Sequence, residues 1–144
     1  MRTFVPKVDP GGRKWWLVDL NDVILGRAAV KVANKIRGKD KPIFTPHLDT
    51  GDHIVAVNAR GLRWTGKNKS AQTKYYRYSG YPGGLRETSL AELMENRPQE
   101  VFRLAVRRML PKNRLGRKML KKLHVYADGT HPHRSQKLQE LKLS

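Results

Sequence analysis

The sequence contains no cysteine, which excludes disulfide bonds and cysteine-based zinc sites. It also has no apolar run close to the roughly 20 residues that a membrane-spanning helix needs. The N-terminal residues MRTFVPKVDPGGRKWW lack the apolar stretch of a secretory signal. Together these absences predict a chain that works in the reducing cytoplasm and uses no membrane.

Acidic residues are scarce and unevenly placed. Twelve Asp and Glu oppose 30 Lys and Arg, which gives a formal net charge of +18. No acid occurs between Asp52 and Glu87 or between Glu100 and Asp128. Such acid-free blocks are typical of surfaces that face nucleic acid, because Lys and Arg displace the counterions condensed on phosphates. A membrane surface is the weaker alternative, since it usually needs an amphipathic helix or a lipid anchor.

The length of 144 residues is typical of one domain, and the pattern of apolar residues predicts an α/β fold. We expect an N-terminal arm over residues 1–14, an α/β domain over 15–126 and a polar C-terminal tail over 127–144 that lies on a partner. Apolar runs predict strands at Trp15–Asp19, Ile54–Ala59, Leu62–Thr65 and Leu123–Tyr126. Helical patterns alternate with these runs, which favours a mainly parallel sheet.

Helices are predicted from apolar spacing and from capping residues, at residues 25–36 before Gly38, 89–96, 98–110 and around 115–123. Ser89 and Glu92 form a capping-box pattern at the start of the second of these helices. Pro98 suits the first turn of the third. Residues 67–85 show no clear period, and we interpret them as an extended functional loop.

Two short motifs resemble catalytic ones but lack essential parts. Gly61–Lys67 matches most of a P-loop, yet Asn68 replaces the Ser or Thr that holds magnesium and no helix pattern follows. A basic turn is the favoured interpretation. Asp49–Gly51 matches the aspartic-protease triplet, but a single copy lacks the second carboxylate, so a turn is favoured again. No nucleophile sits beside a recognisable base, and we expect no enzyme activity.

Two segments have the composition of RNA contacts. Lys74–Leu85 alternates basic residues with four tyrosines, whose rings can stack on unpaired bases or pack into the core. Gly83 and Gly84 permit positive φ and close backbone approach. Met109–Lys122 combines apolar anchors with dense cations that repel one another without an anionic partner. The H-P-H of His131 and His133 makes a poor zinc site, so RNA contact is favoured over metal.

Several strings resemble the ribosomal protein L thirteen family of bacterial large subunits, in order from about Trp15 to His133. These strings are LGRAAVKVANKIRGKDKP, TPHLDTGD, VNA, TGKN, YYRYSGYPGGL, AVRRMLPKNRLGRKMLKKLHVY and HPH. SGYPGGL and MLPKNRLGR are highly specific. Trp64, Tyr78 and Arg108 depart from the family pattern.

The resemblance implies a three-layer α/β/α domain around a small, mainly parallel four-stranded sheet. It implies binding to large-subunit (23S-type) rRNA, a role in early subunit assembly, neighbouring ribosomal proteins as partners, and a place in the cytoplasmic ribosome. It implies no catalytic activity, and we expect no metal, cofactor, membrane or small-molecule substrate. A free nucleic-acid-binding regulator is the alternative, but it would need a recognition element for base edges, for which the helix around residues 103–108 is a weak candidate.

The residues expected to contact RNA combine cations, tyrosines, glycines and polar groups of these segments. They are Arg27, Lys39, Lys41, His47, Lys67, Lys69, Lys74, Tyr75, Arg77, Tyr78, Ser79, Tyr81, Gly83, Gly84, Arg107, Arg108, Lys112, Asn113, Arg114, Arg117, Lys118, Lys121, His131 and His133.

Overall fold

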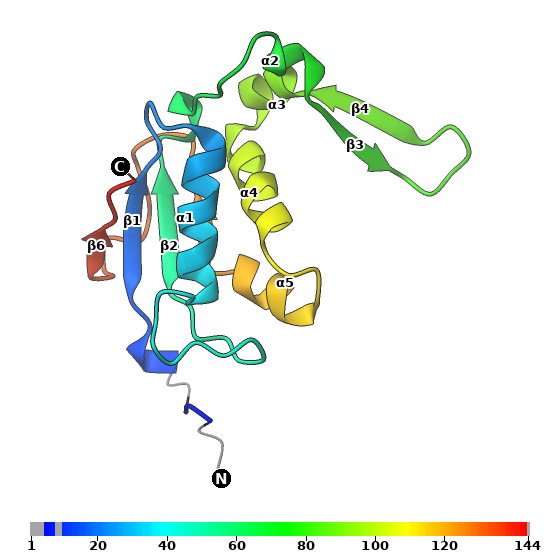
Figure 1. Cartoon of the computed structure of the whole chain (residues 1–144). Coiled ribbons are helices and arrows are strands. Elements are labelled where there is room, and N and C mark those ends of the chain that lie inside the picture. Colours follow the sequence, from blue (N-terminus) through cyan, green and yellow to red (C-terminus); the bar gives the residue numbers. More distant parts are fainter. Residues whose placement is uncertain (1–4, 8–9, 144) are drawn as a thin grey trace.

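The computed structural model describes residues 5–7 and 10–143, so the predicted N-terminal arm lies partly outside the described residues (Figure 1). The strands are β1 (Trp15–Asp19), β2 (His53–Val57), β3 (Lys74–Tyr78), β4 (Leu85–Ser89), β5 (Leu123–Val125) and β6 (Leu138–Glu140). The α-helices are α1 (Leu25–Arg37), α2 (Lys69–Gln72), α3 (Leu90–Asn96), α4 (Pro98–Met109) and α5 (Arg114–Leu120). Two 3₁₀ turns, η1 (Pro10–Gly12) and η2 (Ala59–Gly61), complete the described elements.

Four parallel strands form the central sheet in the order β5-β2-β1-β6. The predicted α/β class and the four-stranded parallel sheet are therefore confirmed. The strand predicted at Leu62–Thr65 is wrong, because only Arg63 of that segment pairs, in an isolated bridge with Ile24. The fourth strand is β6, whose sequence Leu-Gln-Glu lacks an apolar run because it lies at the sheet edge.

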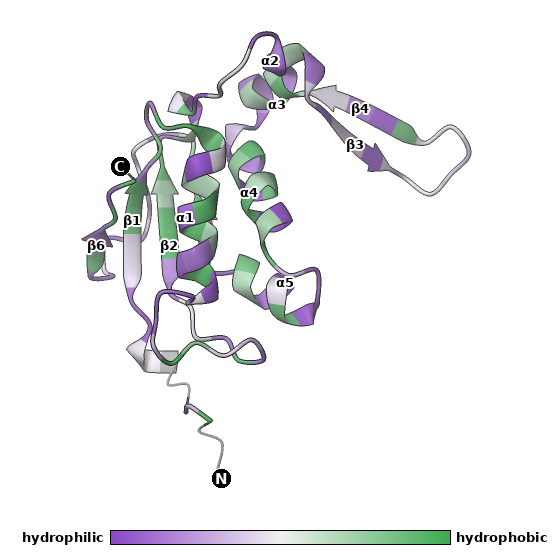
Figure 2. Ribbon diagram, in the orientation of Figure 1, coloured by the Kyte–Doolittle hydropathy of each residue, from purple (hydrophilic) through white to green (hydrophobic). Residues whose placement is uncertain are grey.

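One face of the sheet carries the hydrophobic core. Successive strand residues point to opposite faces, so Val18 and Ile54 lie on the face that packs against α1 and α4. Val32 of α1 and Phe102 of α4 are fully buried there. In Figure 2 both helices have a hydrophobic and a hydrophilic side. The predicted helix over residues 25–36 is confirmed, and Gly38 ends it in the left-handed conformation at φ 79°.

The second face of the sheet is covered by the connection between β5 and β6. Trp15 and His53 are register partners on this face, and their rings stack with centroids 4.3 Å apart. His133 of the connection lies against His124 of β5, with centroids 4.6 Å apart. Residues 126–137 contain no helix. This connection therefore packs on the second face as coil, whereas α1 and α4 pack on the first.

The segment between β2 and β5 supplies α3, α4 and α5, as the sequence predicts. The hydroxyl oxygen of Ser89 accepts a hydrogen bond from the Glu92 amide at 3.2 Å and so caps α3. Pro98 opens α4, and Leu110 follows its last residue. The sequence places Leu123 both in the last helical stretch and at the start of a last strand; the structure confirms the strand, because Leu123 is the first residue of β5.

The interpretation of residues 67–85 as an extended loop is wrong. The segment contains the single turn α2 and then β3, which pairs antiparallel with β4 in a separate two-stranded sheet. Figure 1 shows this hairpin projecting away from the central sheet. The alternation that marks a half-buried strand is absent here, because β3 and β4 expose most of their side chains on both faces.

The division of the chain into arm, domain and tail stays a prediction. One part of the predicted tail, β6, is hydrogen-bonded to the domain through β1. Leu138 pairs in register with Trp15, and the Leu141 amide donates to the Leu17 carbonyl oxygen at 2.9 Å. The tail residues that lie on β1 are therefore structural parts of the sheet.

Candidate nucleic-acid interface

The β3–β4 hairpin presents aromatic and basic side chains to solvent. Tyr76, Tyr78 and Tyr81 are 62%, 63% and 75% exposed. Lys74 pairs with Glu87 across the two strands at 2.8 Å. Glu87 is the only acid of the hairpin, residues 74–89, so the hairpin tip joins exposed rings to unopposed positive charge. This combination suits unpaired bases and phosphates.

The hairpin tip depends on the two glycines that the sequence singles out. Gly83 adopts φ 71°, a left-handed conformation that is strained for residues with a Cβ. Gly84 donates its amide to the Tyr81 carbonyl oxygen at 2.9 Å, and a Cβ at this position would collide with the Ser79 hydroxyl. Ser79 and Gly84 therefore form a close turn, and both remain at the tip where RNA contact is predicted.

Tyr75 differs from the other tyrosines of the hairpin. It is half-buried, and the guanidinium carbon of Arg108 lies 5.2 Å from its ring centroid. Burial raises the pKa of the Tyr75 hydroxyl, against a smaller opposing effect of the Arg108 charge. The Tyr75–Arg108 contact joins the base of the hairpin to the end of α4.

A second basic region covers the end of α4, the turn to α5, and α5. We call it the α4–α5 basic surface; its exposed cations are Arg107, Arg108, Lys112, Arg114, Arg117, Lys118 and Lys121. Arg108 lies over Tyr75, but none of the ion pairs among the described residues involves any of these seven. Their charge is therefore available to an external anion.

Asn113, also predicted to contact RNA, has a structural role within that surface. Its side-chain oxygen accepts a hydrogen bond from the Gly116 amide at 2.7 Å and caps α5. Gly116 is buried, and a Cβ there would collide with the Pro111 carbonyl oxygen. The turn between α4 and α5 is therefore held by a cap and a close backbone approach, and it fixes where Lys112 and Arg114 stand.

The residues of the partial P-loop do not form a phosphate cradle. Gly61 ends η2, Gly66 adopts φ 113°, and Asn68 stands before α2 in the left-handed conformation. The expectation that no helix follows is wrong, but α2 has only four residues. Lys67 and Lys69 are exposed beside this turn, as RNA contact would require.

The turn predicted at Asp49–Gly51 is not formed, because these residues lie in irregular structure that leads into β2 and Asp49 belongs to a buried ionic cluster. Asp49 pairs with the buried Lys122 and with Arg13, the latter at 3.3 Å. Asp52 accepts hydrogen bonds from the Trp16 ring nitrogen at 3.0 Å and from Lys41. Burial alone would raise the pKa of Asp52, but the bonds from Lys41, Trp16 and the Lys14 amide outweigh it and lower that pKa.

Of the other RNA contacts predicted on and after α1, one is bound within this cluster and three are exposed outside it. Lys41 is committed to Asp52 and to the Thr50 carbonyl oxygen, at 2.9 Å from the latter. Arg27, Lys39 and His47 are exposed. Their contact with RNA stays a prediction.

His131 and His133 lie half-buried against the second face of the sheet. The hydroxyl of Tyr126 is hydrogen-bonded to Nε2 of His133 at 2.9 Å, and the His133 ring lies 5.4 Å from that of Trp15. Among the described residues, no group of three or more His, Asp or Glu side chains is placed to hold a metal ion. The contact of this pair with RNA stays a prediction.

Sequence reasoning missed the buried ionic cluster and the stack of rings on the second face. Lys122 looked like one more cation of a basic block, although it is 3% exposed. Residues two apart in a strand share a face, so the predicted strands could have placed Trp15 with Leu17, and His53 with Val55, on one side of the sheet. No residue type in the sequence identified Lys122 as buried.

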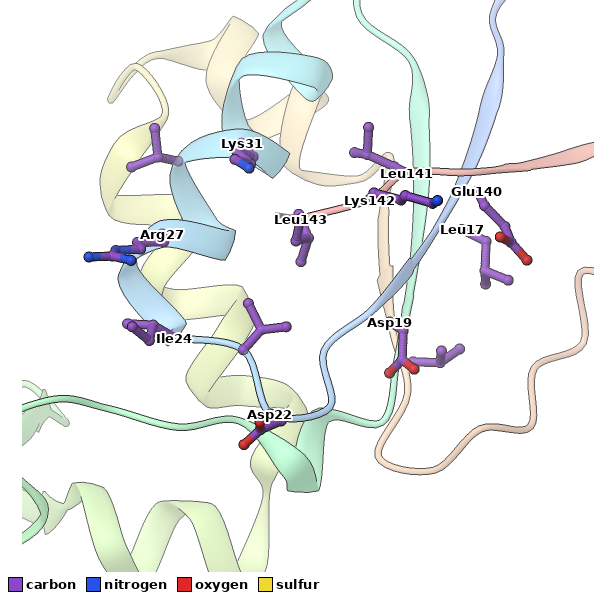
Figure 3. A pocket seen from close by; sticks show the side chains of 13 residues that line it. Leu17, Asp19, Asp22, Ile24, Arg27, Lys31, Glu140, Leu141, Lys142 and Leu143 are labelled. Atoms are coloured by element: carbon purple, nitrogen blue, oxygen red, sulfur yellow. The ribbon is translucent and has the colours of Figure 1, made fainter.

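A groove between α1, β1 and the C-terminal residues lies apart from the cations of the α4–α5 basic surface. Figure 3 shows Leu17, Ile24, Leu141 and Leu143 around this groove, with Asp19 and Glu140 at its edge. Its volume is about 1040 Å³. Its mixed-charge rim is less suited to phosphate than the α4–α5 basic surface.

These features define a class: a basic α/β protein whose cations gather on a projecting hairpin and on one helical surface. No helix in the described part of the chain is long and apolar enough to cross a membrane. The chain belongs to the family described as "Ribosomal protein L13", whose model matches residues 13–132.

Curated relatives support this assignment over nearly the whole chain. "Large ribosomal subunit protein uL13" of Nitrosococcus oceani is 53% identical over 143 residues, covering 99% of this chain and 100% of the relative. The protein of the same description from Lawsonia intracellularis is 56% identical and covers 94% of each chain. That of Aquifex aeolicus is 52% identical and covers 99% of each.

The chain is therefore a ribosomal protein of the large subunit, as the resemblance predicted. Proteins of this family are structural components rather than enzymes, and the predicted place in the cytoplasmic ribosome follows. Membership in the family favours the ribosomal prediction over the alternative of a free regulator.

Proposed function

We propose that the chain binds large-subunit rRNA through the β3–β4 hairpin and the α4–α5 basic surface, and that it supports early assembly of the subunit. The observation that carries the proposal is the acid-free surface of seven exposed cations, none of which pairs with a carboxylate in the described part of the chain. Such cations gain most from phosphate, because binding releases condensed counterions.

The assembly role rests on the same charge. A net charge of +18 opposes compact packing of the chain with itself and lowers the repulsion between RNA segments that it joins. Neighbouring ribosomal proteins stay a predicted class of partner. Depletion of the chain from growing cells is expected to accumulate incomplete large-subunit particles, and normal levels of mature subunits without the chain would contradict this role.

The salt dependence of binding tests the proposed interface. Each phosphate contact contributes about −0.9 to the log–log slope on duplex DNA and about −0.7 on single strands. We expect the triple variant Lys112→Ala, Arg114→Ala and Arg117→Ala to reduce the slope of large-subunit rRNA binding by roughly 2 to 3. Filter binding between low and physiological salt measures it.

The matched control removes three cations that already have carboxylate partners. Arg60 pairs with Asp128 at 3.2 Å, Arg97 pairs with Glu100 at 3.3 Å, and Arg63 pairs with Asp22. Their triple replacement by Ala changes the net charge equally but is expected to leave most of the slope intact. An equal slope in the wild type and in the Lys112, Arg114 and Arg117 variant would contradict phosphate contact at the α4–α5 basic surface.

A further inference from the structure

A small cavity lies within the α4–α5 basic surface, between the end of α4, the turn, and α5. Its volume is about 440 Å³. The apolar lining comes from Leu104, Leu110, Pro111 and Leu120. This size lies within the ordinary range of small-ligand sites, about 300–1,000 Å³.

Cations form the rim of this cavity, and no acid lines it. Arg107, Lys112 and Arg117 come from three successive pieces of the chain and converge on the cavity. The exposed ring of Tyr76 reaches the same cavity from the hairpin. The neighbouring cavity between β3 and α4 differs, because Glu92 and Glu100 line it.

The cavity is held in shape by the turn described above. The cap from Asn113 and the close approach of Gly116 to Pro111 fix the wall that carries Lys112. Leu110 is buried beneath it. A site whose walls are fixed before binding loses little conformational freedom when a ligand enters.

An apolar floor next to several cations matches the two halves of a nucleotide. A planar base gains from apolar contact and from stacking on tyrosine or arginine, whereas its phosphate needs positive charge. A base inside a duplex is already stacked and cannot enter, so the ligand must be unpaired. Exposed Arg114, Lys118 and Lys121 continue the positive surface beyond the cavity, where the flanking phosphates of a strand would lie.

We propose that this cavity binds one unpaired nucleotide of an RNA strand, with the base on Leu104 and Leu120 and the phosphates on Arg107, Lys112 and Arg117. This inference rests on the proposed RNA-binding function and adds to it a base-binding site. The hairpin tyrosines then act as one wall of the site rather than as its only stacking surface.

Two six-nucleotide RNA strands test the proposal with the full chain. One carries six adenines, and the other has the same phosphates and riboses but no bases. Stacking contributes about 1–3 kcal/mol per base, which is roughly a 5- to 150-fold difference in affinity. We expect the wild type to prefer the adenine strand by a factor in this range, measured by fluorescence anisotropy.

Variants of the cavity lining then test whether the preference for the adenine strand arises in this cavity. Leu104→Gln and, from the other wall, Leu120→Gln are expected to lower the ratio between the two strands at least about fivefold, with little change in affinity for the strand without bases. Met109→Gln is the control, because Met109 is an exposed apolar residue of α4 outside the cavity lining. Arg107→Gln is expected to weaken both strands alike and to lower the salt slope by about 0.7.

The outcomes distinguish failure of the nucleotide site from failure of the proposed RNA-binding function. An equal affinity of the wild type for both strands would overturn the nucleotide site and leave a surface for phosphate alone. A strand preference that survives both Leu104→Gln and Leu120→Gln in folded protein would overturn it too. Large-subunit rRNA is titrated in parallel, and weak, salt-insensitive binding of that RNA would instead contradict the proposed function.

Discussion

Loss of the Asp49 carboxylate is expected to destabilise the protein more than loss of both members of its ion pair. The Lys122 ammonium is almost fully buried, and it donates hydrogen bonds to the Asp49 carboxylate and, at 2.9 Å, to the Ile36 carbonyl oxygen. Burial lowers the pKa of Lys122, while the bond to Asp49 opposes that effect. Asp49→Ala therefore leaves a buried charge with a single carbonyl acceptor.

The expected cost follows from that geometry. Removal of one partner from a buried ion pair costs about 3–5 kcal/mol, because the other charge stays buried and uncompensated. At about 2–4 °C per kcal/mol for a chain near this size, the Tm would fall by roughly 6–20 °C. The double variant Asp49→Ala with Lys122→Met removes the buried charge, and we expect it to recover about 1–2 kcal/mol of the loss.

Urea unfolding followed by circular dichroism measures these differences. The control is Asp40→Ala, which removes an exposed pair with Lys35 at 3.1 Å and is expected to cost about 1 kcal/mol or less. The reasoning fails if Asp49→Ala is no more destabilising than Asp40→Ala. It fails equally if the double variant is less stable than Asp49→Ala, since that would show a net gain from the buried Lys122.

Three further predictions concern the ring stack, a helix cap and the core. Burial lowers the pKa of His53 and of His124, so the unfolded chain binds protons first below about pH 6.5. The unfolding free energy is therefore expected to be highest above that pH and to fall as the pH drops toward 5. In urea unfolding measured at several pH values, replacement of both histidines by Gln is expected to flatten this fall. An unchanged dependence on pH in the double variant would contradict the role of the two histidines. Asn113→Ala removes the α5 cap and is expected to cost about 1 kcal/mol in chemical unfolding. Phe102→Ala empties a fully buried core position, and a loss well below about 3 kcal/mol in the same assay would contradict its placement at the centre of the core.

Apolar periodicity and capping residues are sufficient to predict a helix or strand whose signals lie within a few residues of one another. The apolar face of α1, the Ser89 cap and the position of Pro98 depend on neighbours only a few residues away, so the sequence predicts these helices. The buried strands β1 and β2 are continuous apolar runs for the same reason. The strand at Leu138–Glu140 has no such run and exists because β1 offers it a free edge.

The hairpin and the buried Lys122 depend on contacts between distant parts of the chain. The residues of β3 expose most of their side chains, so the hydrophobic effect leaves no period-2 pattern to detect. Lys122 is buried because Asp49, 73 residues earlier in the chain, supplies its counter-charge. The clustering of exposed cations on α4 and α5 was predictable from the missing acids, whereas the commitment of Lys41 to Asp52 was not.

Ultraviolet cross-linking of intact large subunits, followed by mass spectrometry of the linked peptides, tests the proposed RNA interface most directly. We expect linked residues to concentrate in the hairpin, residues 74–89, and in the α4–α5 basic surface, residues 107–121. Cross-links confined to the groove between α1 and residues 140–143, with none on the hairpin or on that surface, would contradict it.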